Sequence, residues 1–156
     1  MKRLTLTIVA IAIAIGFQFA TAQTANQTLN LNVASSAVIE VQGNSVDLSI
    51  NGFTVGQPSA SVADNTTSLS YIHNYTGAGA KISASLSSAL QSGLLLTTSI
   101  NGGLPVNIES GATMDVELNI SAGSYTNRTI GYVFTATPEV GQVNEIQTVT
   151  YTISAQ

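Results

Sequence analysis

Residues 114–120 read Met-Asp-Val-Glu-Leu-Asn-Ile and alternate apolar with polar side chains at every position. This period of two is typical of a β-strand that faces a core on one side and solvent on the other. The positions expected to face the core are Met114, Val116, Leu118 and Ile120. We expect Asp115 and Glu117 on the opposite face to be solvated and to discourage edge-to-edge pairing between molecules.

The same alternation recurs along the rest of the chain. Apolar residues repeat at every second position in residues 29–33, 37–41, 46–50, 69–71, 82–86, 130–134 and 149–153. Turn-forming pairs such as Asn51-Gly52 and Asn101-Gly102 separate these runs, and no run has the 3.6-residue period of a helix, although residues 86–96 are ambiguous. We therefore expect an all-β protein with eight or nine short strands in a single antiparallel sandwich, of jelly-roll or immunoglobulin-like type.

The N-terminus predicts export. Lys2 and Arg3 precede a mostly apolar run over residues 4–19, and Ala20-Thr21-Ala22 supplies the small residues that signal peptidases recognise. We expect a signal peptide over residues 1–22, cleavage between Ala22 and Gln23, and an extracellular or cell-surface location. The apolar run is shorter than the roughly 20 residues of a membrane span. The alternative is a retained N-terminal segment, as in type IV pilins and archaellins, which are cut ahead of their apolar run.

Composition narrows the function classes. Removing 22 residues from 156 leaves 134, enough for one domain with its own core. Only Lys81 and Arg128 then remain against eight acidic residues, a net charge of −6 that argues against nucleic acid as a partner. The chain has no cysteine and therefore no disulfide. Its single histidine is His73, and no serine lies in a nucleophile-elbow motif for which His73 could act as the base. We expect no enzyme activity, no catalytic or metal-binding residues and no cofactor, with His73 a polar residue at a strand end.

Five Asn-x-Ser/Thr sequons could carry N-linked glycans, which would supply the hydration that few charges provide. They begin at Asn26, Asn65, Asn74, Asn119 and Asn127. We expect Asn65 and Asn127 to lie in turn-like segments, Asn74 at a strand end and Asn119 on the polar face of a regular strand. N-glycans are thus the covalent partners predicted by the sequence.

Residues 23–36 form a candidate arm ahead of a sandwich domain over residues 37–156. Leu29, Leu31 and Val33 alternate with polar residues, and the small residues Ala34-Ser35-Ser36 form a joint to the next alternating run. One interpretation is an ordinary first strand paired within its own sheet. The other is a donor strand that leaves its own domain and enters a groove in a neighbouring copy, where these three side chains would contact the groove.

The C-terminal third resembles a known class. Ala122-Gly123-Ser124-Tyr125-Thr126 leads into an alternating strand and then a closing strand, Val149-Thr150-Tyr151-Thr152-Ile153. This pattern is similar to the end of secreted pilin-type β-sandwiches. With its N-terminal strand and small-residue joint, the whole mature chain resembles donor-strand-exchange filament subunits, in particular archaeal thread or bundling-pilus subunits and bacterial biofilm-matrix fibre proteins.

The resemblance implies a jelly-roll subunit of a homopolymeric pilus or filament, in which an N-terminal strand fills a groove in the next subunit, with a role in adhesion, bundling or biofilm. The absence of cysteine departs from many chaperone–usher pilins, and the five sequons favour an archaeal source. A different class also remains open, namely a monomeric secreted module that binds a surface or a carbohydrate. Such a module is expected to display exposed aromatic platforms, and the mature chain has few aromatic residues.

Overall fold

A computed structural model describes residues 27–43 and 45–156. The predicted signal peptide over residues 1–22, its cleavage site between Ala22 and Gln23, and the sequon at Asn26 lie outside the described residues. The chain divides into two units, one ending at Asn32 and the other spanning Val33–Gln156. Within the first unit, residues 27–32 form no strand and are exposed.

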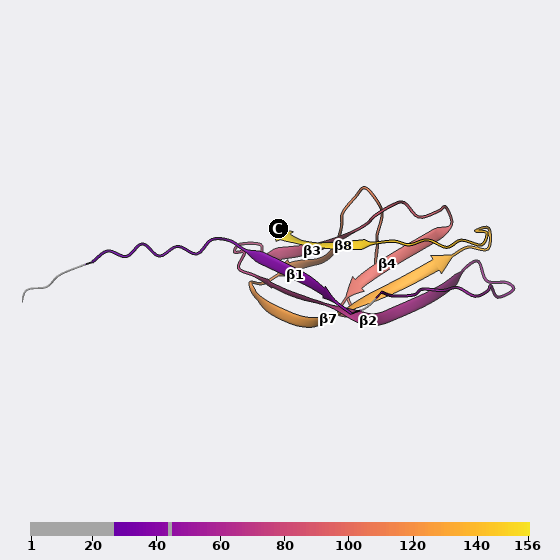
Figure 1. Cartoon of the computed structure of the whole chain (residues 1–156), viewed down its shortest axis with the longest axis horizontal. Helices are drawn as coiled ribbons and strands as arrows, with labels where there is room; N and C mark the ends of the chain where they lie inside the picture. Colours follow the sequence, from indigo (N-terminus) through magenta and orange to yellow (C-terminus); the bar gives the residue numbers. More distant parts are fainter. Residues whose placement is uncertain (1–26, 44) are drawn as a thin grey trace, which may run out of the picture. The chain divides into compact units, whose positions relative to one another are not determined.

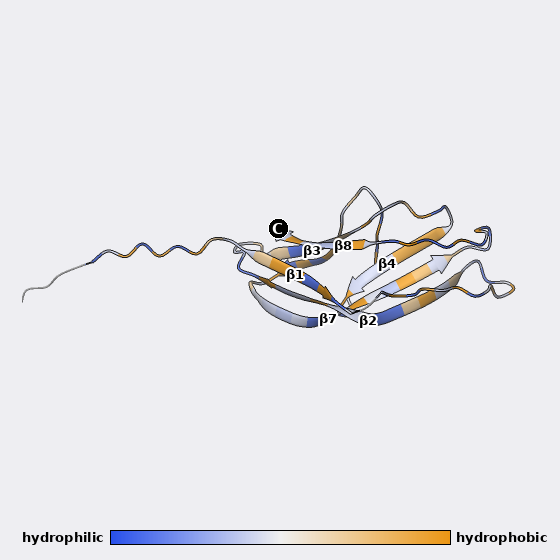
Figure 2. Ribbon diagram, in the orientation of Figure 1, coloured by the Kyte–Doolittle hydropathy of each residue, from blue (hydrophilic) through white to orange (hydrophobic). Residues whose placement is uncertain are grey.

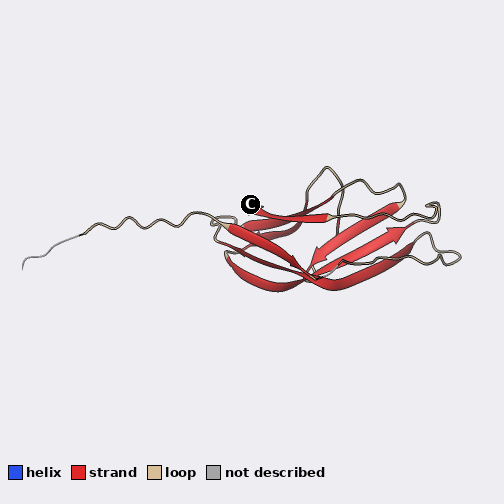
Figure 3. Cartoon of the chain, viewed as in Figure 1, coloured by secondary structure: helices blue, strands red, loops and turns tan. Residues whose placement is uncertain are grey.

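The described residues form eight β-strands and no helix (Figures 1 and 3). The strands are β1 (Ala37–Gln42), β2 (Ala60–His73), β3 (Ala80–Leu86), β4 (Leu94–Ile100), β5 (Val106–Asn107), β6 (Met114–Ile120), β7 (Gly123–Ala136) and β8 (Val149–Ala155). The predicted all-β class is confirmed. The ambiguous residues 86–96 contain the end of β3, a loop and the start of β4.

The strands form two antiparallel sheets that pack as a β-sandwich. The larger sheet has the order β1-β2-β7-β4-β5 and the smaller one the order β6-β3-β8. The chain crosses between the sheets at almost every connection from β2 onward, so the core is built from strands distant in sequence. The two long strands β2 and β7 pair through two register shifts, which bend them without ending them.

The core lies between the sheets and takes apolar side chains from both. Its fully buried members include Leu69, Ile82, Ile108 and Ile130. The larger sheet also contributes Tyr132 and the smaller one Tyr151, whose hydroxyl donates to that of Tyr132 at 3.1 Å. Tyr151 also shares a 2.7 Å hydrogen bond with Thr98, so this buried polar group has partners on two strands of the facing sheet.

The crossover from β6 to β7 contains a tyrosine corner. The hydroxyl of Tyr125 donates to the carbonyl oxygen of Ser121 at 2.9 Å, closing the chain back on itself as β7 begins. This contact is typical of chain corners in β-sandwiches. Gly79 allows the chain to turn tightly just before β3. It has a φ of 85°, and a side chain there would collide with the carbonyl oxygen of Ile120.

The predicted alternation in β6 is wrong at Glu117 and Leu118, whereas Ile120 is buried as predicted. Glu117 turns toward the protein, whereas Leu118, expected in the core, is 48% exposed. The pairing of β3 with β6 shifts register twice, and Asn119 has a φ of 57°, so β6 is not a regular strand. A bulge reverses the inward and outward positions that follow it, which a simple period of two does not anticipate.

Candidate functional site

A large open groove lies where the smaller sheet leaves the larger one uncovered. In Figure 1, β3 and β8 cover only part of the larger sheet, and segments without strand structure run over the rest. The groove has a volume of about 1090 Å³. Its floor comes from β4 and β7, chiefly Leu94, Leu96, Tyr132 and Phe134.

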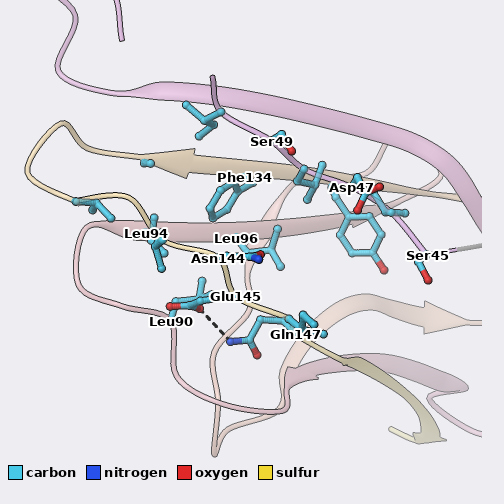
Figure 4. Close-up of a pocket in the computed structure, with 18 of the residues that line it drawn as sticks. Ser45, Asp47, Ser49, Leu90, Leu94, Leu96, Phe134, Asn144, Glu145 and Gln147 are labelled. Carbon is cyan, nitrogen blue, oxygen red and sulfur yellow. Dashed lines mark hydrogen bonds between the residues drawn. The ribbon is translucent and has the colours of Figure 1, made fainter. Parts of the chain in front are cut away.

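Two segments border this groove. The first rim is residues 45–53, which follow β1, and the second rim is residues 141–148, which precede β8. In Figure 4, Phe134 and Leu96 lie between the segment with Asp47 and Ser49 and the segment with Asn144 and Glu145. The groove therefore has an apolar floor between two lengths of chain that lie outside the sheets.

The first rim has the side-chain pattern of a strand without a strand's partner. Val46, Leu48 and Ile50 are half-buried and alternate with exposed polar residues. Among the described residues, no backbone hydrogen bond joins residues 45–53 to another segment. The sequence predicts a strand over residues 46–50, and the structure contradicts that prediction because the pairing is missing.

The second rim is held by side chains. Gln147 exchanges hydrogen bonds with Ser88, and Glu145 accepts one from the backbone N–H of Gln91 at 3.2 Å. Within the described part of the chain, residues 141–147 make no backbone hydrogen bond to another segment. Both rims thus hold backbone donors and acceptors unpaired beside an apolar floor, which is what an added β-strand satisfies.

The arm residues expected to fill a groove lie exposed. Leu29, Leu31 and Val33 are 68%, 90% and 85% exposed, unusually high for consecutive apolar positions of one segment. Figure 2 shows bands of orange and blue that alternate along the described N-terminal trace. Residues 27–33 carry no charge, so nothing in them opposes Asp47 and Glu145 of the rims.

The acidic pair of β6 is not a freely solvated face, which corrects the prediction. Glu117 accepts hydrogen bonds from the Arg128 guanidinium at 3.0 Å and from the Tyr71 hydroxyl at 3.2 Å. Asp115 is more exposed and accepts from Ser83 and from Lys81. The Ser83 hydroxyl and then the Lys81 ammonium hold the pKa of Asp115 below its usual value. Both basic residues of the predicted mature chain are therefore engaged in ion pairs.

The four described sequons differ in their surroundings. Asn65 lies exposed at a register shift in β2, and Asn127 lies at one in β7 with a φ of 53°, so both occupy bulged strands instead of the predicted turns. Asn119 is close to the end of β6 and accepts a hydrogen bond from Gln156. Asn74 directly follows β2, at the predicted strand end, but its amide is engaged with the chain at Ala34 and Ser36.

His73 is the last residue of β2, as predicted, and its side chain is buried. Its ring centroid lies 5.5 Å from that of Tyr75, and neither ring nitrogen has a hydrogen-bond partner among the described residues. Across the same residues, no group of three or more His, Asp or Glu side chains is placed to hold a metal ion.

The sequence predicts an arm over residues 23–36 and a groove in a neighbouring copy, but it does not indicate which residues form the groove. Of the floor residues, Tyr132 and Phe134 lie in a predicted strand, and Leu94 and Leu96 lie in the stretch whose pattern is ambiguous. The second rim gives no signal, because residues 141–148 do not alternate. The alternation of residues 46–50 was the available signal, yet a pattern of side chains does not reveal that the backbone lacks a partner.

Comparison with protein-family models, with curated proteins and with solved structures finds no match for this chain. In the part of the chain that the structure describes, no helix is long and apolar enough to cross a membrane.

Proposed function

We propose that this chain is a structural subunit of an extracellular filament. Each subunit adds its N-terminal arm, residues 23–33, as a strand in the groove of a neighbouring copy. The observation that carries the proposal is the groove itself, which has an apolar floor of Leu96 and Phe134 between two rims. In these rims, residues 45–53 and 141–147 make no backbone hydrogen bond to another described segment. In this proposal the fold is a jelly-roll-like sandwich that is completed by a strand from another molecule.

The arm and the groove are complementary in pattern. The arm offers apolar side chains on one face, while its backbone offers donors and acceptors on both edges. With the apolar face on the groove floor, the polar residues Thr28, Asn30 and Asn32 point to solvent. The first rim has the same alternation, so it becomes a regular strand once its backbone is paired.

The expected magnitude suits a durable joint. Burying Leu29, Leu31 and Val33 contributes about 1.5–3 kcal/mol for each side chain. Roughly six backbone hydrogen bonds add about 1 kcal/mol each. Ordering the arm removes part of this gain, but the remainder is sufficient for a long-lived contact between subunits.

Glycans on the exposed sequons complete the proposal, with Asn65 and Asn127 as the preferred acceptors. Both side chains are exposed and both lie at bulges, where the strand departs from regular pairing. Sugars there would hydrate the outside of a filament whose subunits carry few charges.

Electron microscopy of secreted material tests assembly. A chain lacking residues 23–33 should fold and form no filaments. Leu31→Asp should also block assembly, because it places a carboxylate without a partner on the groove floor. Asn30→Asp is the matched control: it adds the same charge on the solvent face and should assemble. Filaments from the deleted chain, or equal loss from both substitutions, would overturn the proposal.

A further inference from the structure

The side chain of Asn74 ties down the chain at the base of the arm. Its Oδ1 accepts a hydrogen bond from the backbone N–H of Ser36 at 2.6 Å, and its Nδ2 donates to the carbonyl oxygen of Ala34 at 2.8 Å. The backbone N–H of Asn74 also donates to the carbonyl oxygen of Ser36 at 3.1 Å. Three hydrogen bonds from one residue thus fix the joint to the end of β2.

These contacts extend the pairing of β1 with β2. The last pair of that ladder joins Ala37 to His73, so Ser36 and Asn74 are the next opposite residues. The side chain then continues past the ladder to Ala34. The division of the chain into units falls immediately before this point, between Asn32 and Val33. The joint therefore belongs to the sandwich, and the arm starts where the contacts of Asn74 end.

We propose that Asn74 is a positioning residue for assembly and that its sequon stays without a glycan. This inference rests on the proposed strand addition. By fixing residues 34–36, the Asn74 amide restricts the directions in which the arm leaves its own sandwich. The arm then loses less freedom when it enters the neighbouring groove, and strand addition is faster.

The same geometry disfavours glycosylation. A sugar on Nδ2 leaves this atom a single hydrogen and places bulk beside Ala34, where the joint already lies. Asn65 and Asn127 make no such contact with the joint. The sequon at Asn74 therefore satisfies the acceptor pattern, but its amide is already used in the structure.

The test separates the amide from the sequon. Asn74→Ala removes both, whereas Thr76→Ala removes only the sequon and keeps the Asn74 contacts. In the full mature chain with Asn74→Ala, we expect the Ser36 amide hydrogen to exchange roughly tenfold faster than in wild type. We also expect assembly to be roughly tenfold slower. Both effects are of the size expected for the loss of two ordinary hydrogen bonds. Thr76→Ala should match wild type in both. Asn74→Asp keeps an acceptor for Ser36 but loses the donor to Ala34, so it should fall between them.

A second readout separates positioning from stability. The full mature chain with Leu31→Asp should not assemble and should keep its groove empty. A synthetic peptide of residues 23–33 should bind this chain equally with and without Asn74→Ala, because the groove is intact in both. Weaker peptide binding to Asn74→Ala, normal assembly of that variant, or a glycan on Asn74 in the wild-type protein would overturn this inference. Absence of peptide binding to the Leu31→Asp chain, whose groove is empty, would instead overturn the proposed function.

Discussion

Tyr71 of β2 donates a hydrogen bond to Glu117 of β6 at 3.2 Å, and this contact joins the two sheets of the sandwich. The ring of Tyr71 also stacks on that of Tyr125 with 4.8 Å between centroids, while Arg128 donates to the same carboxylate. A chain without cysteine has no disulfide between its sheets. Here polar contacts of partly buried side chains supply a specific link in its place.

Ionisation of the Tyr71 hydroxyl should lower the stability of the fold in alkali. Burial first, and then the nearby Glu117 carboxylate, raise the pKa of Tyr71 to about 12. Tyrosine in an unfolded chain ionises near pH 10, at about its unperturbed pKa, so the unfolded state releases its proton first. The stability from Tyr71 is thus present in full below about pH 10 and is lost as the pH rises toward about 12.

Denaturant unfolding across this range should show a smaller loss of free energy for Tyr71→Phe than for wild type. Burial also raises the pKa of Tyr132 and of Tyr151, so a part of the alkaline loss should remain in the variant. An identical pH dependence of the two proteins would show that Tyr71 ionises as freely when folded as when unfolded.

The two ion pairs should differ in strength. Glu117→Gln weakens the partly buried contact with Arg128 and should cost about 1–2 kcal/mol of unfolding free energy. Asp115→Asn, on the same strand, weakens the more exposed pair with Lys81 and should cost less than about 1 kcal/mol. Equal losses in chemical denaturation would mean that Glu117 is no more than a surface residue.

The sequence predicted the fold class because alternation records which face of a strand is buried. Residues 82–86 and 149–153 form β3 and β8 where that pattern placed them. The pattern failed at Leu118, since a register shift between Asp115 and Glu117 interrupts the period of two. The pattern failed again over residues 46–50, because strand formation needs a partner backbone and the described residues of the single chain do not provide one. The groove combines residues far apart in sequence and therefore has no local signature.

Assembly should raise thermal stability. An empty groove leaves apolar surface and unpaired backbone groups exposed, and an inserted arm covers both, so folding and polymerisation are linked. Filaments should melt far above the chain lacking residues 23–33. Reductant should change neither melting temperature, and salt should change both only slightly, because Lys81 and Arg128 already pair within the subunit. Equal melting temperatures would mean that one chain completes its own fold, and would favour the monomeric binding module.

Intact mass and peptide mapping test glycosylation. The mature protein should exceed its polypeptide mass in discrete sugar steps, with Asn65 and Asn127 the most occupied. Asn119 should be less occupied, because its amide oxygen and its backbone N–H both contact Gln156. A mass equal to the bare polypeptide would remove glycans from the account.

Disulfide trapping in assembled material tests the central claim most directly, since the chain has no cysteine of its own. Cysteine is introduced at Asp47, on the solvent side of the first rim, and in turn at Thr28, Asn30 or Asn32 of the arm, which together cover every register of that face. Replacing Asp47→Cys by Glu40→Cys, on the open edge of β1, gives the control. The account predicts a ladder of covalent multimers for at least one Asp47 combination and none for Glu40. Cross-linked monomers, or a ladder only with Glu40, would contradict insertion of the arm into the groove of a neighbouring subunit.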